Sequence, residues 1–216
     1  MPDRSQDSRE EYLAALLEPD PARAREVVRA AVREGLSIEA AYLEVLAPAM
    51  VEIGLLWERD EIGIAHEHLA AEVTASLVSE LGERLRGGSA TGRLAVVSCS
   101  PEERHCIGGQ MLGGMLEAAG WEVLYLGATL PVEDLVGLAE DEAADVIALS
   151  TTMPEHLPEV RRAIEAVQRM DDPPLVIVGG QAYDGEQDAR RVGADAWAPD
   201  AAAAPSLLGR KLPPAA

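Results

Sequence analysis

The segment PEERHCIGGQ, residues 101–110, carries the side chains of this sequence best suited to chemistry. It follows LAVVSCS, an apolar run of β-type residues that predicts a strand. Glu103 lies two residues before His105, so its carboxylate can accept a proton from one nitrogen of the imidazole ring. A neutral imidazole is a good ligand for a transition metal, which makes His105 a candidate metal ligand. For this motif in isolation, the alternative is a histidine that caps the following helix.

Two further segments follow apolar runs of the same kind. Ser150 and Thr152 point to the same side if their strand continues, and their hydroxyls could then bind a polar ligand. The alternative is that they cap the next helix or close the turn before Pro154. Gly179 and Gly180 allow a backbone to approach closely, although a glycine pair is also common in tight turns.

The elements that must position these residues are strands and helices in alternation over residues 93–210. The runs LAVVSCS, WEVLYLG, DVIALS, PLVIVGG and ADAWAP predict five strands separated by helical segments. This alternation predicts an α/β domain with a flavodoxin-like (Rossmann-type) five-stranded parallel sheet and helices on both faces. Ligands of such sheets bind at the carboxyl ends of the strands, so we expect the three segments to line one site.

Residues 8–86 have helical rather than β periodicity. Four amphipathic segments with short connections predict an N-terminal four-helix bundle, with a kink at Pro48. RGGSATG, residues 86–92, has the composition of a flexible hinge. Trp57 ends the third predicted helix, and His66, Glu67 and His68 lie in the fourth. His66 and His68 face different sides of a helix and make a poor metal pair; the alternative is a Trp in the bundle core beside a solvated histidine.

The composition excludes several classes of function. The chain has 216 residues with 38 acidic and 18 basic side chains, a net charge of −20, so direct binding to nucleic acid is not expected. Its uninterrupted apolar runs are shorter than the ~20 residues of a membrane span, and the first residues lack the apolar core of a signal peptide. The two cysteines, Cys99 and Cys106, do not make a disulfide framework, which favours a reducing cytoplasm.

Three motifs taken together closely resemble the signature of the cobalamin-binding domain, DxHxxG…SxL/T…GG, with Glu in place of the Asp. They are Glu103-x-His105-x-x-Gly108, Ser150-x-Thr152 and Gly179-Gly180. The resemblance implies that the histidine ligates cobalt from below and displaces the cofactor's own dimethylbenzimidazole. The displaced nucleotide tail is then expected beside the sheet, lined by the hydroxyl and glycine positions of these motifs.

The helical half is similar to the bundle that caps the upper face of the corrin in this family. Trp57 with Glu67-His68 matches the Wx₉EH pattern of CarH-type photoreceptors, where these residues pack around an upper adenosyl group. In those photoreceptors a histidine follows the Trp directly, whereas this sequence has Glu58. His66 or His68 is therefore the candidate for an upper-face ligand of cobalt, with water as the alternative.

The resemblance implies a stand-alone light sensor that is not an enzyme. Photolysis of bound adenosylcobalamin would change conformation or assembly and signal to a partner protein, a regulator or signalling protein, without direct nucleic-acid or membrane binding. A homo-oligomer is compatible with this resemblance. The alternative is a corrinoid shuttle protein of a methyltransferase system, a non-catalytic carrier using methylcobalamin. A mutase subunit, or a storage or chaperone protein, is a further alternative.

Overall fold

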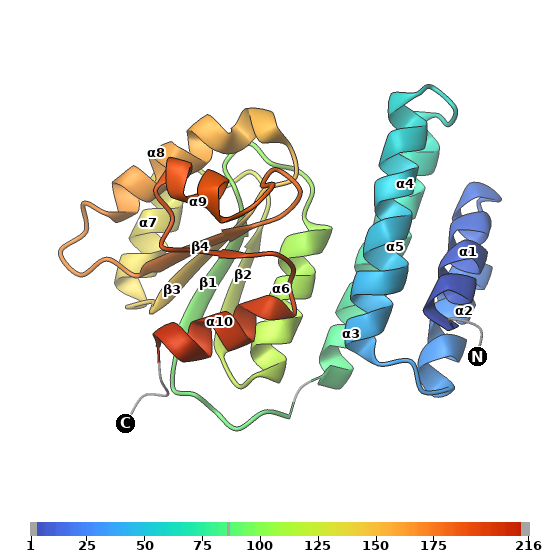
Figure 1. Ribbon diagram of the computed structural model, residues 1–216, viewed down its shortest axis with the longest axis horizontal. Helices are drawn as coiled ribbons and strands as arrows, with labels where there is room; N and C mark the ends of the chain where they lie inside the picture. Colours follow the sequence, from blue (N-terminus) through green and yellow to red (C-terminus); the bar gives the residue numbers. More distant parts are fainter. Residues whose placement is uncertain (1–3, 86, 213–216) are drawn as a thin grey trace. The chain divides into compact units, whose positions relative to one another are not determined.

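The computed structural model describes residues 4–85 and 87–212 and consists of two compact units (Figure 1). The first unit ends at Arg84 and is entirely helical, whereas the second begins at Leu85 and contains the sheet. The predicted combination of a helical bundle with a five-stranded parallel α/β domain is confirmed.

The helical unit is built from four rods. They are α1 (Arg4–Leu17), α2 (Pro21–Arg33), a composite rod of α3 (Ile38–Ala40), η1 (Ala41–Leu46) and α4 (Ala47–Glu58), and α5 (Ile64–Leu85). Asp20 and Ser37 are the N-cap residues of α2 and α3. Their side chains accept hydrogen bonds from backbone N–H groups of the first turn. Two wholly buried tyrosines tie α5 to the other rods: Tyr12 hydrogen-bonds Thr74 at 2.8 Å, and Tyr42 donates to the carbonyl of Val78 at 2.6 Å.

Pro48 does not break the third rod. The six residues before α4 form a π-helix, in which the N–H of Ala47 bonds the carbonyl of Tyr42, five residues back. Proline offers no N–H and its ring crowds the carbonyl four residues earlier, and the wider π-helical turn before it accommodates both effects. Among the described residues, Ile38–Glu58 is one helical stretch whose length and apolar composition would allow a membrane span, a test that core helices of soluble proteins also pass.

The second unit alternates strands and helices as predicted. Its elements are β1 (Leu94–Cys99), α6 (Ile107–Ala118), β2 (Glu122–Gly127), α7 (Val132–Asp141), β3 (Val146–Ser150), η2 (Pro154–His156), α8 (Leu157–Val167), β4 (Leu175–Gly179), α9 (Glu186–Val192), β5 (Ala196–Ala198) and α10 (Ala203–Lys211). All strand pairs are parallel, in the order β2-β1-β3-β4-β5. This doubly wound order brings the ends of β1, β3 and β4 side by side.

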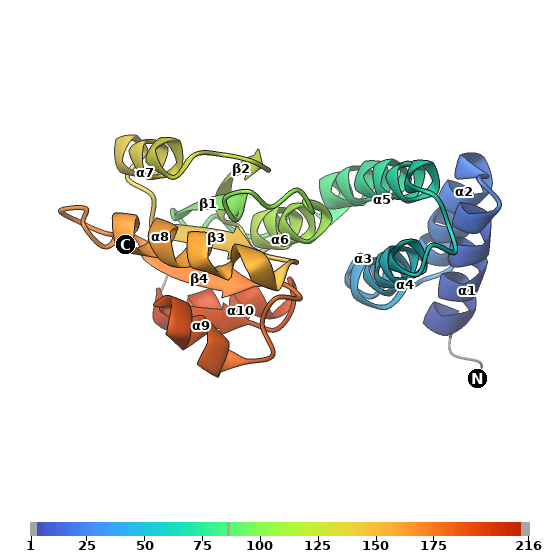
Figure 2. The same ribbon diagram turned by 90° about the horizontal axis from the view of Figure 1, so that it is seen from above.

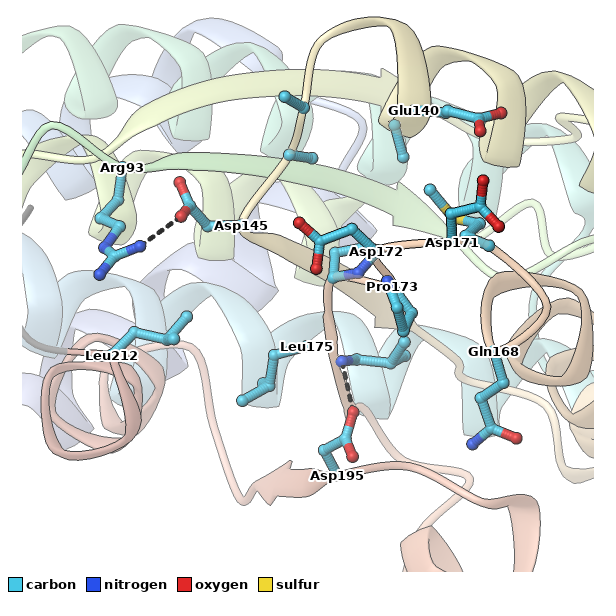
Figure 3. A pocket seen from close by; sticks show the side chains of 16 residues that line it. Arg93, Glu140, Asp145, Gln168, Asp171, Asp172, Pro173, Leu175, Asp195 and Leu212 are labelled. Carbon is cyan, nitrogen blue, oxygen red and sulfur yellow. Dashed lines mark hydrogen bonds and ion pairs between the residues drawn. The ribbon is translucent and has the colours of Figure 1, made fainter.

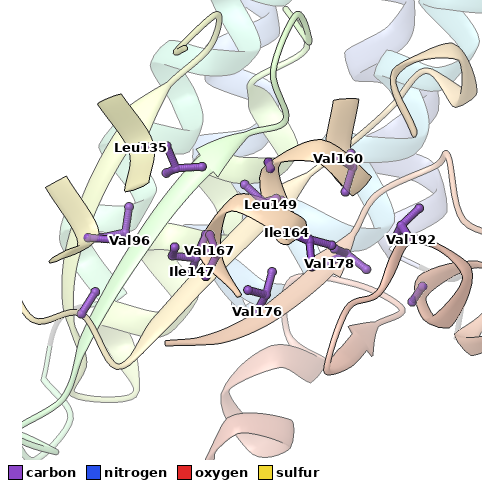
Figure 4. Close-up of a cluster of buried hydrophobic side chains, with 14 of the residues drawn as sticks. Val96, Leu135, Ile147, Leu149, Val160, Ile164, Val167, Val176, Val178 and Val192 are labelled. Atoms are coloured by element: carbon purple, nitrogen blue, oxygen red, sulfur yellow. The ribbon is translucent and has the colours of Figure 1, made fainter. Parts of the chain in front are cut away.

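The sheet is covered by helices on both faces (Figure 2). One face carries the larger apolar cluster, in which Val96, Ile147 and Val176 pack against α7, α8 and α9 (Figure 4). On the other face, Val97, Ala148 and neighbouring residues pack against α6 and α10. Side chains alternate between the faces along each strand, so both faces of these apolar strands are buried. The result is a rigid sheet from which the loops at its carboxyl end project.

The segment predicted to be a flexible hinge is largely held in place. Arg86 lies outside the described residues, but residues 88–91 pack against the turn that ends α6. The N–H of Thr91 donates to the carbonyl of Gly120 at 2.8 Å. Gly120 has a positive φ of 88°, and a Cβ there would lie 1.9 Å from the carbonyl oxygen of Ser89. The glycines of this segment therefore serve a close backbone contact as well as flexibility.

Candidate functional site

The carboxylate of Glu103 joins two loops at the carboxyl end of the sheet. Its Oε1 accepts hydrogen bonds from the backbone N–H groups of Arg104 and His105, at 2.9 and 3.0 Å, in the loop after β1. Its Oε2 accepts from the backbone N–H groups of Thr152 and Met153, at 2.8 and 3.0 Å, in the loop after β3. Glu103 is wholly buried, so these bonds replace the water that its charge would otherwise require.

The hydrogen bonds to Glu103 decide its charge. Burial by itself raises the pKa of a carboxyl group, because it disfavours the ionised form. Here the bonds from the ring and backbone of His105, and from the backbone of Met153 and Thr152, outweigh burial and hold the pKa of Glu103 well below its usual range. Glu103 is therefore a fixed negative charge directly beneath the histidine.

His105 is the exposed member of this pair. Its Nδ1 lies 2.5 Å from Glu103 Oε1, and about half of its side chain, 52%, is exposed. It does not cap the next helix: the N-cap of α6 is Cys106, and no side chain makes a capping bond there. A carboxylate on Nδ1 fixes the tautomer and the ring orientation, so that Nε2 is the nitrogen presented to a metal. The geometry therefore favours the metal-ligand interpretation over the cap.

A second histidine, His156, contacts the same carboxylate. Its Nδ1 lies 3.3 Å from Glu103 Oε2, and its side chain is 19% exposed. Sequence analysis missed it because the contact joins residues 53 positions apart. The available signal was that His156 ends STTMPEH, one of the segments already expected at the site.

Gly108 lies close to Ser150 at the carboxyl end of β3. Gly108 is in the first turn of α6, and a Cβ added to it would lie 3.2 Å from Ser150 Oγ. Any larger side chain at position 108 would therefore crowd the end of β3. Together with an exposed imidazole held by a carboxylate, this cradle fits a corrinoid that takes His105 as its lower ligand.

Gly179 and Gly180 have structural reasons to be glycine. Gly180 has a positive φ of 106°, and a Cβ there would lie 2.2 Å from the carbonyl oxygen of Thr151. A Cβ on Gly179 would lie 2.9 Å from the carbonyl oxygen of Ala198. These contacts bring the end of β4 close to its neighbours β3 and β5. Thr152 reaches the site through its backbone N–H, and a role for its hydroxyl or for the glycines along a nucleotide tail stays a prediction.

The remaining predicted residues belong to the helical unit. Trp57, at the end of α4, is 46% exposed and does not fill the bundle core. Glu67 lies in the first turn of α5, and its carboxylate is 3.8 Å from Nε2 of its neighbour His68, whose side chain is 72% exposed. His66 is half-buried one residue before Glu67. The proposed roles of these residues at the upper face of cobalt stay predictions.

A hollow of about 650 Å³ lies at the opposite end of the strands, where they begin (Figure 3). Its lining includes Arg93, Asp145 and Asp195. Arg93 pairs with Asp145 at 2.5 Å, and Asp195 accepts the N–H of Val176 at 2.8 Å. These carboxylates are satisfied by protein groups, and the hollow is not part of the Glu103 site.

Both halves of the chain match models of a B12 binding domain, over residues 8–81 and residues 93–206. Dimethylamine corrinoid protein 1 of Methanosarcina mazei is 31% identical over 208 residues, which cover 91% of this chain and 94% of the relative. The structure of the monomethylamine corrinoid protein of Methanosarcina barkeri aligns with a TM-score of 0.83 and 19% identity, over 96% of this chain and 99% of that one. The methanol:cobalamin methyltransferase complex MtaBC of Methanosarcina barkeri aligns with a TM-score of 0.53 and 16% identity, over 95% of this chain and 79% of the matched chain. These structural likenesses show a shared fold.

The interpretation of the chain as a light sensor is wrong. Its relatives are named as corrinoid proteins of methylamines, and one matched structure is a methyltransferase complex. The photoreceptor interpretation depended on Trp57 and Glu67-His68, a short pattern in a helical segment. In the structure, Trp57 and His68 are exposed side chains of the bundle. A three-residue match of this kind carries far less information than the matches over both halves of the chain.

The resemblance to cobalamin-binding proteins is confirmed. The two family models together span most of the sequence, and one relative matches across both the helical and the α/β unit. The chain belongs to the B12-binding domain family, as a corrinoid protein that joins an N-terminal helical unit to a Rossmann-like domain.

Proposed function

We propose that this protein is a corrinoid shuttle that carries a methyl group between partner methyltransferases, with methylcobalamin as its loaded form. The observation that carries the proposal is the buried Glu103 carboxylate, which holds the ring of His105 at 2.5 Å while half of that ring is exposed. Its support comes from the corrinoid relatives, which are named for methylamines. In this role the protein is a carrier and not itself an enzyme.

The bound corrinoid would supply a cobalt ion whose upper face accepts and releases a methyl group. His105 would hold the lower face through Nε2. The ionised Glu103 accepts the Nδ1 proton of His105, which makes the ring a better electron donor. The backbone donors of the loop after β3 keep the carboxylate in place. Glu103 thereby links the lower ligand to two strands of the rigid sheet.

His156 and Gly108 would complete the site. His156 holds Glu103 Oε2 on the side away from His105, so it limits rotation of the carboxylate. Gly108 lets the first turn of α6 approach Ser150 Oγ closely, beside the loop that would face the cofactor. Neither residue is proposed to react; both position groups that touch the cofactor.

The partners we propose are methyltransferases that act on small methyl donors such as methylated amines. The support is in the names of the relatives and of the methanol:cobalamin methyltransferase complex. A shuttle must present its cofactor to two such proteins in turn, so its complexes should be transient. We further propose a cytoplasmic location, which suits the free thiols of Cys99 and Cys106.

The proposal is tested by methyl loading. The purified chain is loaded with cobalamin, reduced chemically, and incubated with radiolabelled dimethylamine and a dimethylamine methyltransferase. We expect label on the protein in proportion to its bound cobalamin, and loss of that label in His105→Ala but not in the neighbouring surface variant Arg104→Gln. A chain that binds cobalamin tightly but neither gains methyl from a panel of such donors nor loses it to an acceptor thiol would contradict the shuttle.

A further inference from the structure

Two cysteines flank the loop that carries Glu103 and His105, and the proposed shuttle function uses neither. Cys99 is the last residue of β1 and is 1% exposed. Cys106 is the N-cap of α6 and is partly exposed. Both are free thiols. The residues between them, 100–105, are therefore a short loop with a thiol at each end.

The fold brings the two ends of this loop together. The Cys99 thiol donates to the carbonyl oxygen of His105 at an Sγ–O distance of 3.6 Å. That carbonyl is bonded directly to the nitrogen of Cys106, so the buried thiol lies against the backbone that carries its partner. The Cys106 thiol turns back along the loop and donates to the carbonyl oxygen of Arg104 at 3.1 Å.

One further contact fixes this arrangement. Tyr125 on β2 donates its hydroxyl hydrogen bond to the carbonyl of Cys106 at 3.0 Å, which holds the start of α6 over the sheet. The Cys99 thiol therefore lies against the backbone that joins His105 to Cys106, and the Cys106 thiol lies along the same loop.

We propose that Cys99 and Cys106 form a reversible disulfide that locks the loop carrying His105 and lowers the affinity of the protein for its corrinoid. The physical reason is geometric. A disulfide requires the sulfurs to approach to about 2.05 Å, and both thiols must then give up their hydrogen bonds to the carbonyls of Arg104 and His105. The backbone of the loop has to move with them, so His105 leaves the position that Glu103 fixes.

The oxidant is a low-molecular-weight disulfide. The more accessible Cys106, as thiolate, attacks one sulfur of that disulfide and releases one small thiol, which leaves a mixed disulfide on Cys106. Cys99, as thiolate, then attacks the Cys106 sulfur and releases the second small thiol. The protein thiols lose two protons and two electrons in total, and the small disulfide is reduced to two thiols.

The test uses the full chain free of cofactor, so its first result does not depend on the shuttle proposal. The protein is incubated with oxidised glutathione, and intact mass and free-thiol content are measured with time. We expect a monomer two mass units lighter without free thiols, reversed by dithiothreitol. Cys106→Ser should remove this product, and Cys99→Ala should stop at a glutathione adduct on Cys106. If Cys99→Ala does not fold, Cys106→Ser alone decides the assignment.

The second measurement is cobalamin binding by visible spectroscopy. We expect the oxidised protein to bind about tenfold more weakly than the reduced protein, the lower end of the loss caused by disturbing an outer-shell partner of a metal ligand. Cys106→Ser should bind equally before and after oxidant. Persistence of two free thiols, a product that is only intermolecular, or unchanged cobalamin affinity in the disulfide form would each overturn the proposal.

Discussion

Two carboxylates bridge β1 and β3, one where the strands begin and one where they end. Only the one at the carboxyl end of the strands supports a candidate binding site. Asp145, where the strands begin, pairs with Arg93 at 2.5 Å and accepts the N–H of Leu94 at 2.8 Å. Glu103, where the strands end, takes three donors on each oxygen and is wholly buried. Asp145 is partly exposed, and its interactions fasten two strand ends.

The difference lies in what each carboxylate positions. Asp145 holds Arg93 and the backbone N–H of Leu94 at the start of the neighbouring strand β1, so its interactions only join two strand ends. Glu103 holds the ring of His105, which stays half exposed and is directed outward by the contact. A buried carboxylate that orients an exposed imidazole indicates a binding function more strongly than an ion pair between two protein side chains does. Variants of Glu103 and Asp145 can therefore test which end of the strands binds the cofactor.

The largest expected effect is that of Glu103→Ala. It removes the acceptor of several buried donors, so we expect a loss of about 3 kcal/mol in the free energy of unfolding and loss of tight cobalamin binding. Asp145→Ala, at the more exposed edge, should cost about 1 kcal/mol and leave binding intact. Urea unfolding and spectroscopic titration measure both. Equal losses of cobalamin binding in the two variants would contradict the claim that only the Glu103 end of the strands binds the cofactor.

The next effect is on the pH dependence of stability. The folded pKa of Glu103 lies well below that of an unfolded glutamate, so the folded protein binds fewer protons at this group. The contribution of Glu103 to the free energy of unfolding is fully present above about pH 5. It is lost as the pH falls through the pKa of the unfolded state toward the pKa of the folded state. We expect Glu103→Gln to flatten the fall in unfolding free energy between about pH 5 and 3. Urea unfolding at each pH measures this slope, and a wild-type slope in Glu103→Gln would contradict the expected role of the Glu103 charge.

A smaller effect is expected for His156→Gln. The variant loses the 3.3 Å contact to Glu103 but keeps the backbone donors of Thr152 and Met153. We expect cobalamin affinity to fall about tenfold, as for other outer-shell partners of a metal ligand, with little change in stability. Titration of the visible spectrum measures the affinity. Arg93→Gln, at the opposite end of the strands, should leave the cobalamin affinity unchanged. A similar loss of affinity in Arg93→Gln would show that the effect is not specific to the Glu103 site.

The smallest effect concerns the loop itself. Glu102 has a φ of +67°, a left-handed conformation that costs a non-glycine residue roughly 1 kcal/mol. Glu102→Gly should therefore stabilise the protein by about 0.5–1 kcal/mol and leave cobalamin binding unchanged. Thermal unfolding measures the gain. A loss of binding in this variant would show that the strain at position 102 helps to place Glu103.

The parts of the fold that depend on local pattern were predictable. The alternation of strands and helices follows from periodicity, and the doubly wound order is the usual one for the fold class that this alternation predicts. The pairing of Glu103 with His105 also follows from spacing, because two residues in one turn reach each other without help from the rest of the chain. The contact of residues 88–91 with the turn at Gly120 was not predictable from composition, because Gly120 is distant in sequence.

The sequence by itself predicted that this chain joins a helical unit to a doubly wound sheet and that Glu103 and His105 lie together in the loop after the first strand. Only the tertiary structure decided that Glu103 is a buried ion shared by two loops, that His156 contacts it, and that the thiols of Cys99 and Cys106 lie beneath the same loop. The physical reason is that hydrogen bonds to a buried charge depend on which strand ends become neighbours. That arrangement follows from the packing of the whole sheet and has no local signature.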